Sequence, residues 1–199
     1  MSTIDYLIHI YRIGNKPFRS LSALPDEQAI DLMSSMYVEG SVFWERFKDP
    51  VDYLQARRQT EQWLRQEFIA KGGAPQMPYP IYFIFGWTKW LMTGADETTL
   101  ATTANLQVPL SLFGEDDVSF TYPDSMITSW LASEKDERVY LPEFHGRVFT
   151  LREMQAIVEA NGLPGERWGY LPVDVPNYIE AQVWNQVPLV EYLRIAENR

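Results

Sequence analysis

The segment that most constrains this fold is a helical pattern that begins at Asp49-Pro50 and continues without interruption to Lys71. Proline is favoured at the first position of a helix, where the backbone N–H would have no helical partner. The pattern ends at Gly72-Gly73, because glycine is the usual residue just past the last helical turn. At 1.5 Å per residue such a helix is roughly 33 Å long. It is the longest helix that the sequence predicts.

The two sides of this helix differ in composition. The apolar side is predicted to face the core and comprises Tyr53, Leu54, Trp63, Leu64 and Phe68. The charged residues are predicted to form ion pairs on the solvent side and comprise Arg57, Arg58, Glu61, Arg65 and Glu67. Alternating charges of this kind are typical of a solvated helix surface.

Runs rich in β-branched and aromatic residues predict strands before and after the long helix. These runs are residues 6–13, 80–86, 118–122 and 178–184, with a short edge strand at 106–113 that contains a proline. The first two runs are apolar on both faces, so they are expected near the centre of a sheet. Residues 93–104 are small and polar and predict a surface loop.

Shorter helices are predicted after Ser22, over 125–131 and from Thr150 to Asn161. Thr150 and Glu153 have the spacing of a capping box, in which each side chain bonds the backbone of the other. Residues 188–193 predict a short helix or strand. The order of elements indicates one α+β domain over 1–199, with a mixed or mainly antiparallel sheet flanked by helices.

The charge and residue content exclude several classes of function. The net charge of −10 disfavours nucleic-acid and anionic-membrane partners, since both are negatively charged. The chain has no cysteine and only two histidines, His9 and His145, so neither thiol chemistry nor a metal site is expected. No apolar run is long enough for a membrane span, and the first residues lack the pattern of a signal peptide. These features favour a cytoplasmic location.

The late strand 178–184 has two chemically different faces, because successive side chains point to opposite sides. Ile179, Ala181 and Val183 form a core face. The opposite face carries Tyr178, Glu180, Gln182 and Trp184, which fit either a ligand-facing wall or an ordinary half-buried surface. A second ambiguous acid is Asp124, at a strand end. We interpret it as the N-cap of the helix that follows.

The distribution of polar residues over three strands resembles that of ADP-ribosyltransferase-like proteins. The first strand carries His9, Tyr11 and Arg12, a middle strand carries Tyr82, and the late strand carries Glu180. The resemblance implies NAD as the bound molecule and Glu180 as the carboxylate that assists bond breakage at the ribose. It also implies that His9, Tyr11, Arg12 or Tyr82 contact the nucleotide. Gln182 and Trp184 are further candidate ligand contacts, because they share the polar face of the late strand with Glu180. The chain lacks the Gly-Thr after His9 and the Ser-Thr-Ser motif of that family.

A second resemblance covers about the last two thirds of the chain. Residues 68–75, 80–90, 119–124 and 178–184 are similar to a family of uncharacterised bacterial proteins, which implies no particular activity. The sequence therefore favours a domain that binds a small ligand or a protein partner without a cofactor. Two alternatives stay open: an NAD-dependent ADP-ribosyltransferase-like enzyme, and an acidic inhibitor or immunity-type protein that covers a basic partner.

Overall fold

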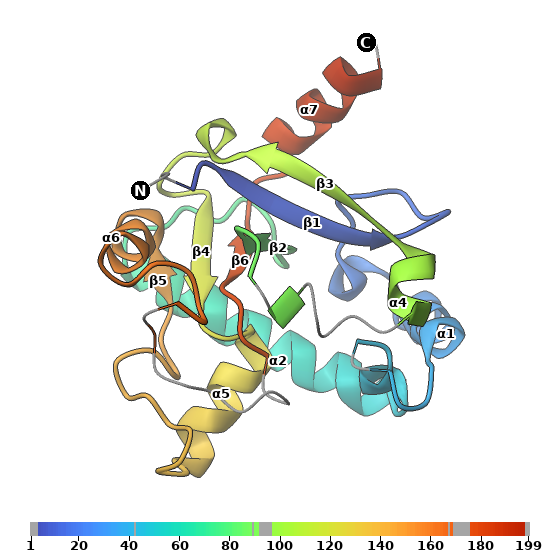
Figure 1. The fold of residues 1–199 in the computed structure, drawn as a ribbon. Helices are drawn as coiled ribbons and strands as arrows, with labels where there is room; N and C mark the ends of the chain where they lie inside the picture. Colours follow the sequence, from blue (N-terminus) through green and yellow to red (C-terminus); the bar gives the residue numbers. More distant parts are fainter. Residues whose placement is uncertain are drawn as a thin grey trace.

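Six strands form one antiparallel sheet in the order β3-β1-β2-β6-β4-β5 (Figure 1). In this computed structural model the described residues are 4–41, 43–88, 90–91, 97–166, 168 and 176–197. The strands are β1 (Tyr6–Arg12), β2 (Ile81–Phe85), β3 (Thr103–Pro109), β4 (Val118–Thr121), β5 (Phe149–Thr150) and β6 (Glu180–Val183). The predicted central position of the first two strands is confirmed, since β1 and β2 each have a neighbour on both sides.

Helices flank the sheet, which makes the protein α+β as expected. The helices are α1 (Asp26–Met36), α2 (Pro50–Ala70), α4 (Glu97–Thr102), α5 (Ser125–Glu134), α6 (Leu151–Asn161) and α7 (Val187–Glu197). Single 3₁₀ turns occur at η1 (Leu21–Ala23), η2 (Glu45–Phe47) and η3 (Leu110–Leu112). The described part of the chain contains no helix that is both long enough and apolar enough to cross a membrane.

One face of the sheet is apolar and carries the largest core. It includes Leu7, Phe83, Phe120 and Val183, which are at most 2% exposed. Leu151 and Met154 of α6 and Leu189 of α7 pack in the same cluster. These two helices therefore cover what we call the apolar face.

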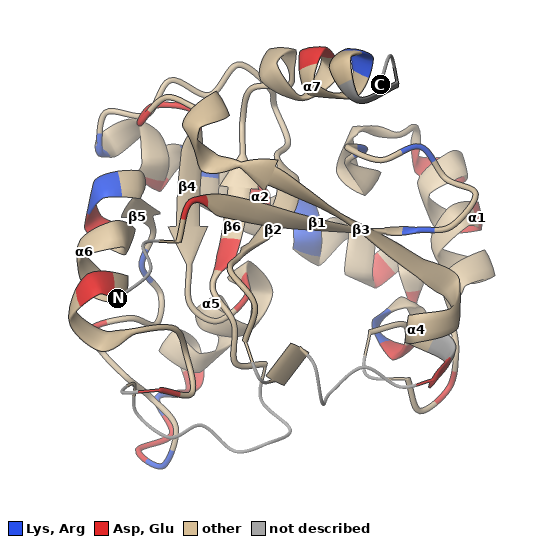
Figure 2. Ribbon diagram, turned by 45° about the horizontal axis from the view of Figure 1, so that its top comes forward, with Lys and Arg blue, Asp and Glu red and all other residues tan. Residues whose placement is uncertain are grey.

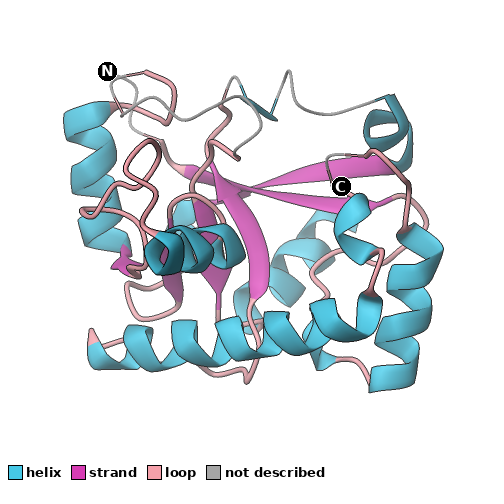
Figure 3. Cartoon of the chain, turned by 90° about the horizontal axis from the view of Figure 1, so that it is seen from below, coloured by secondary structure: helices cyan, strands magenta, loops and turns pink. Residues whose placement is uncertain are grey.

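The other face of the sheet contains both polar and apolar side chains, and we call it the polar face. The register places Ile84 beside Glu180 and Glu180 beside Thr121, while Tyr82 lies beside Gln182 and Gln182 beside Ser119. The long helix α2 runs along the molecule beside the strands (Figure 3). Its Leu64 and Phe68 pack with Trp184 on this face.

Two predictions from helical periodicity and spacing are confirmed. The helix α2 begins at Pro50 and ends one residue before Lys71, as expected. The Thr150 hydroxyl accepts the Glu153 N–H, and Glu153 Oε2 accepts the Thr150 N–H, which completes the capping box.

The prediction of a loop over 93–104 is wrong for its second half. Residues 92–96 lie outside the described residues, but Glu97–Thr102 is helical and Thr103 already belongs to β3. This edge strand pairs with β1 over its whole length, from Thr103 opposite Arg12 to Pro109 opposite Tyr6. The ladder of backbone hydrogen bonds outweighs the weak strand preference of these small residues.

The prediction that the charges of α2 face solvent is wrong for two of them. Glu61 is fully buried, and the Arg57 side chain is only 13% exposed. Arg57 follows Tyr53 by four residues, and Glu61 follows Arg57 by four. Both residues therefore continue the stripe of the helix that faces the protein interior. This ion pair lies on the side of α2 that faces the polar face of the sheet.

Candidate functional site

A cavity of about 350 Å³ lies between the polar face of the sheet and the first turns of α2, and we call it the central cavity. Strands β1, β2 and β6 form one wall, α2 and the segment around η2 form the opposite wall, and α4 borders it. Its charged and phenolic wall residues are Arg46, Tyr53, Arg57, Tyr82, Tyr178 and Glu180. A volume of this size suits a small organic molecule.

Two further cavities, one smaller and one of similar volume, adjoin the central cavity. The carboxylate cavity, of about 190 Å³, is lined by Asp124 and Glu180. The β1–α1 cavity, of about 380 Å³, is lined by the end of β1, the connection to α1 and part of α1. Arg57 and Tyr82 line all three cavities, so these two side chains stand at their junction.

Arg57 is held at the junction by several contacts. Its guanidinium lies 4.4 Å from the centre of the Tyr82 ring, within cation–π range. Nε donates to Glu61 Oε1 and to Ser22 Oγ, both at 3.1 Å, and a terminal nitrogen donates to the Tyr53 hydroxyl at 3.3 Å. Burial acts to lower the pKa of Arg57, but Tyr53, Tyr82 and Glu61 raise it overall. Arg57 is therefore a permanent, fixed positive charge.

Arg46 supplies a second positive charge on the same wall as Arg57, opposite the strands. It comes from η2, lines both the central and carboxylate cavities, and keeps an exposed surface. Its Nε donates to the Phe43 carbonyl at 2.6 Å, and no carboxylate of the described residues lies within ion-pair distance. Burial lowers its pKa, but Tyr53, Tyr178 and Asp124 raise it overall. Arg46 thus faces the cavities without a bound counter-ion from the protein.

Asp124 and Glu180 form a pair of carboxylates at the start of α5. Asp124 Oδ1 accepts the N–H groups of Met126 and Ile127, which confirms the predicted N-cap. Glu180 Oε1 accepts the Ser125 N–H at 3.0 Å. Burial and the neighbouring Asp124 charge raise the pKa of Glu180 to about 7, although hydrogen bonds from Ser125 and Gln182 oppose the rise. A carboxyl group with this pKa both accepts and donates a proton near neutrality.

Buried hydrogen bonds fix the orientation of Glu180. Gln182 Nε2 donates to Glu180 Oε1 and to Thr121 Oγ1, while Gln182 Oε1 accepts from Ser119 Oγ. Ser119 Oγ in turn accepts the Trp184 indole N–H at 2.9 Å. The two hydrogen bonds that reach Glu180 directly, from Gln182 Nε2 and from the Ser125 N–H, both end on Oε1, which leaves Oε2 for a ligand in the cavities that Glu180 lines.

Aromatic rings form much of the remaining wall. Trp90 lies 5.6 Å from Tyr178 and 5.9 Å from Phe43, measured between ring centres. Phe47 contacts Trp44 on one side and Tyr53 on the other. Burial raises the pKa of Tyr82 and Tyr178 well above the usual phenol value, so both hydroxyls stay protonated as hydrogen-bond donors. Flat rings with phenol groups favour a planar ligand.

Two of the seven candidate residues from the sequence, Glu180 and Tyr82, meet in the central cavity. Tyr11 and Arg12 line the β1–α1 cavity instead, where Arg12 also donates to the Ser35 carbonyl. Their cavity is connected to the central cavity through Tyr82, which lines both. With His9, described next, the structure brings five of the seven candidates to adjoining cavities.

His9 also lines the β1–α1 cavity, but both of its ring nitrogens are occupied. Nδ1 lies 2.9 Å from the Tyr82 carbonyl, and Nε2 accepts the Phe18 N–H at 2.9 Å. This pattern requires the neutral ring with its proton on Nδ1. Burial lowers the pKa of His9 to about 4, against the opposing effect of the Tyr82 carbonyl. The ring joins β1 to β2 and to the following loop.

Gln182 and Trp184 contact the protein's own groups. Both are fully buried, and Trp184 stacks on Phe68 of α2 with ring centres 6.4 Å apart. Neither lines any of the cavities described above. Gln182 acts on the site through its bond to Glu180.

Sequence reasoning missed four wall residues as ligand contacts, namely Arg46, Tyr53, Arg57 and Asp124. The spacing of Tyr53, Arg57 and Glu61 was the available signal, since it continues the buried stripe of α2. No local pattern marks Arg46, which reaches the cavities only because η2 folds beneath the sheet.

The largest hollow, about 850 Å³, lies elsewhere, on the outer side of α2. Its Arg58 is already paired with Asp26 at 2.7 Å and bonded to the backbone of Ser22 and Leu24. Within the described residues, no three potential metal ligands come together. The carboxylates and arginines of the central region are therefore the stronger candidate site.

Comparisons with known proteins add no relative. No protein-family model matches the chain, and no curated protein or solved structure matches it either. The geometry of the cavities is therefore the basis for the function proposed below.

Proposed function

We propose that this protein binds a small planar organic anion in the central cavity. The observation that carries this proposal is Arg46, a cation that faces two cavities without a carboxylate at ion-pair distance among the described residues. A charge at a cavity wall is stabilised most by a ligand of opposite charge. Arg57, on the same wall, adds a second cation, and the rings of Trp44 and Tyr178 provide flat apolar surfaces.

The position of the two arginines suggests how such a ligand is oriented. Its anionic group would lie between Arg46 and Arg57, because planar guanidinium groups bind carboxylates through paired hydrogen bonds. Its planar part would contact the aromatic wall. Glu180 Oε2 would then lie beside the ligand and donate a hydrogen bond when protonated.

Calorimetry with benzoate tests this proposal, with benzyl alcohol as the uncharged analogue. We expect benzoate to bind and benzyl alcohol to bind at least tenfold more weakly. Arg46→Gln should abolish the preference, whereas Arg46→Lys should keep part of it because the charge remains but the fork is lost. Arg147→Gln is the matched control, since Arg147 is exposed and lines none of the cavities. Equal affinity for the acid and the alcohol, or no effect of Arg46→Gln, would contradict the proposal.

An NAD-dependent transferase is a second candidate, favoured by the accessible Oε2 of Glu180 and the neighbouring Asp124. In this proposal NAD extends through the adjoining cavities and the carboxylate assists cleavage at the ribose. Nicotinamide release from NAD, measured by chromatography, should occur with the wild type and with Glu159→Gln, an exposed control on α6. It should fall at least a hundredfold with Glu180→Gln. Equal rates in both variants, or no release at all, would exclude this candidate.

A further inference from the structure

The β1–α1 cavity has a charge that is unlike the rest of the protein. Four basic residues line it, Arg12, Lys16, Arg19 and Arg57, and no aspartate or glutamate does. The whole chain has 27 acidic and 17 basic residues, so random placement would favour acids on any wall. Figure 2 shows basic segments in the connection between β1 and α1. This segregation creates a local positive field within an acidic protein.

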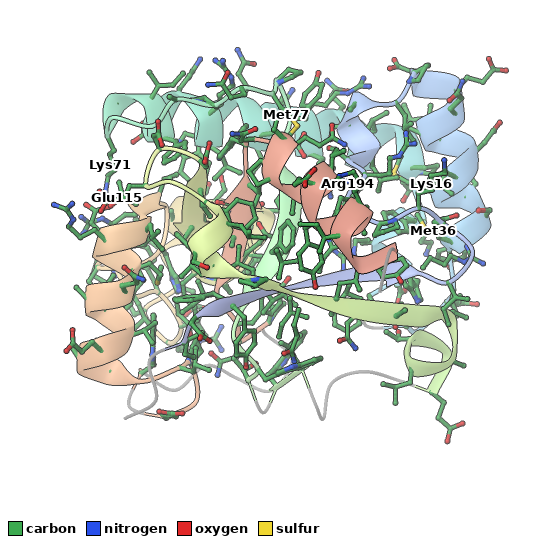
Figure 4. The ribbon with its side chains drawn as sticks, turned by 90° about the horizontal axis from the view of Figure 1, so that it is seen from above. Lys16, Met36, Lys71, Met77, Glu115 and Arg194 are labelled. Atoms are coloured by element: carbon green, nitrogen blue, oxygen red, sulfur yellow. The ribbon has the colours of Figure 1, made fainter. Side chains whose placement is uncertain are left out.

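Two of these cations are not neutralised by the protein. Lys16 and Arg19 are exposed at the cavity and have neither an ion pair nor a side-chain hydrogen bond among the described residues. Figure 4 shows Lys16 close to Met36 of α1, which lines the same cavity. Arg12 has one bond, to the Ser35 carbonyl, which leaves most of its donors available.

A buried hydroxyl gives a second and independent indication of a ligand. Ser20 lines the cavity, is 9% exposed, and its Oγ has no hydrogen-bond partner. A buried hydroxyl without a partner is unfavourable by about 1–3 kcal/mol. By contrast, the nearby Ser22 Oγ accepts a bond from Arg57. The Ser20 hydroxyl therefore has an unused hydrogen-bonding capacity at the wall of the cavity.

We infer that the β1–α1 cavity binds a phosphoryl group, with Lys16, Arg19 and Arg12 as its cations and Ser20 Oγ as a hydrogen-bond donor. Several cations without a neighbouring acid suit a group that carries about two negative charges better than a single carboxylate. Lysine binds such a group as a point charge, and arginine binds it through a planar fork. His9 adds no charge there, since its ring is neutral and its nitrogens are bonded to backbone.

This site is distinct from the central cavity proposed for a planar anion, although the two share Arg57 and Tyr82 as a wall. The inference does not rest on that proposed function. The shared wall does predict that one molecule with a planar acid at one end and a phosphoryl group at the other would occupy both sites. Such a linked ligand binds more tightly than either part alone.

Calorimetry with inorganic diphosphate as the probe tests the inference on the whole chain. We expect binding that weakens as the salt concentration rises, as ionic contacts require. Lys16→Gln/Arg19→Gln should weaken binding at least tenfold. The control Lys135→Gln/Arg147→Gln removes the same charge away from the cavity and should leave binding within twofold of the wild type.

Ser20→Ala separates the proposed site from a general attraction of anions to a basic surface. Loss of one hydrogen bond should weaken diphosphate binding about fivefold. The melting temperature without ligand should be unchanged or higher, since an unpaired buried hydroxyl is removed. Unchanged binding in Ser20→Ala and in the double variant would overturn the inference, as would the absence of binding at millimolar diphosphate.

Two further comparisons identify the source of the phosphoryl group and keep the two sites apart. Co-sedimentation with phosphatidic-acid vesicles, lost in the Lys16/Arg19 variant, would assign the group to a lipid headgroup, whereas diphosphate binding without co-sedimentation would assign it to a soluble molecule. Arg46→Gln should leave diphosphate binding intact, and the Lys16/Arg19 variant should leave benzoate binding intact. Loss of both ligands in both variants would contradict the assignment of two separate sites.

Discussion

The two halves of α2 face the same side of the sheet but make different contacts with it. The second half is closed: Leu64 and Phe68 are fully buried and pack with Trp184. The first half is open: Tyr53 and Arg57 line the central cavity opposite Tyr82. One helix therefore supports both a packed core and a candidate site.

The two halves differ because the side chains that they direct toward the strands differ in polarity. Apolar side chains of Leu and Phe gain free energy by removing each other's surface from water. Arg57 and Glu61 instead require hydrogen bonds to offset their loss of water, and those bonds hold them in place rather than allow close packing. The buried ion pair of Arg57 and Glu61 thus fixes one side of the central cavity, at a cost to the free energy of folding.

The largest effect is expected from removing one member of this pair. Glu61→Leu leaves Arg57 without its buried carboxylate and should lower the free energy of unfolding by about 3–5 kcal/mol. The double variant Arg57→Met/Glu61→Leu removes both charges and should recover most of this loss. Urea denaturation of the wild type and both variants provides the measurement. If the double variant is as unstable as Glu61→Leu, packing rather than charge determines the stability of the first half of α2.

The closed half should tolerate loss of a polar contact better, with no effect on ligand binding. Trp184→Phe removes the indole donor to Ser119 and part of the ring, and should cost about 1–3 kcal/mol. Benzoate affinity should stay within twofold of the wild type, because Trp184 lines none of the cavities described. A tenfold loss of affinity without a change in structure would show that the two halves are coupled.

The pH dependence of stability should distinguish Glu180 from an ordinary surface acid. Its folded pKa of about 7 exceeds the ordinary value of 4.5, so the folded state holds a proton that the unfolded state has released between these values. Wild-type stability should therefore fall relative to Glu180→Gln as pH rises from about 4.5 through about 7, and the difference should then be constant. We expect a change of roughly 1 kcal/mol after allowance for partial exposure. Parallel denaturation curves of the two proteins from pH 5 to pH 8 would contradict this expectation.

The smallest effect is expected at His9, which belongs to the sheet rather than to the acid–base chemistry. Burial lowers its pKa to about 4, so its ring should stay neutral from pH 8 to pH 5.5. Nitrogen NMR of the imidazole should show the Nδ1–H form throughout this range. A midpoint near 6.5 would show that the ring is exposed to solvent and free to act on a ligand.

The sequence predicted the elements that depend on local interactions. The ends of α2, the capping box at Thr150 and Glu153, and the N-cap at Asp124 were all predicted from spacing and residue type. The core face of the last strand was predicted in the same way, since Ile179, Ala181 and Val183 are fully buried. These features follow from the backbone periodicities of helices and strands.

The site residues were predicted less completely, because a cavity depends on contacts between distant segments. Alternation along the strand identified Glu180 as a polar residue on one face, but only the fold shows that Gln182 and Trp184 are buried, the latter against Phe68 of α2, while Glu180 lines the central cavity. The helical spacing of Arg57 and Glu61 is consistent with their inward direction. Their charge, however, favoured the interpretation that they face solvent.

By itself, the sequence determined most of the helical and strand segments, the acidic charge and the two chemical faces of β6. Only the tertiary structure decided that Arg46, Arg57 and Tyr82 meet Glu180, and that Lys16 and Arg19 border a cavity without acids. The physical reason is the range of the interactions: helix caps and side-chain alternation act within a few residues. The pairing of β1 with β2 joins segments more than 60 residues apart along the chain, and the contact of Arg57 on α2 with Tyr82 on β2 joins residues 25 apart.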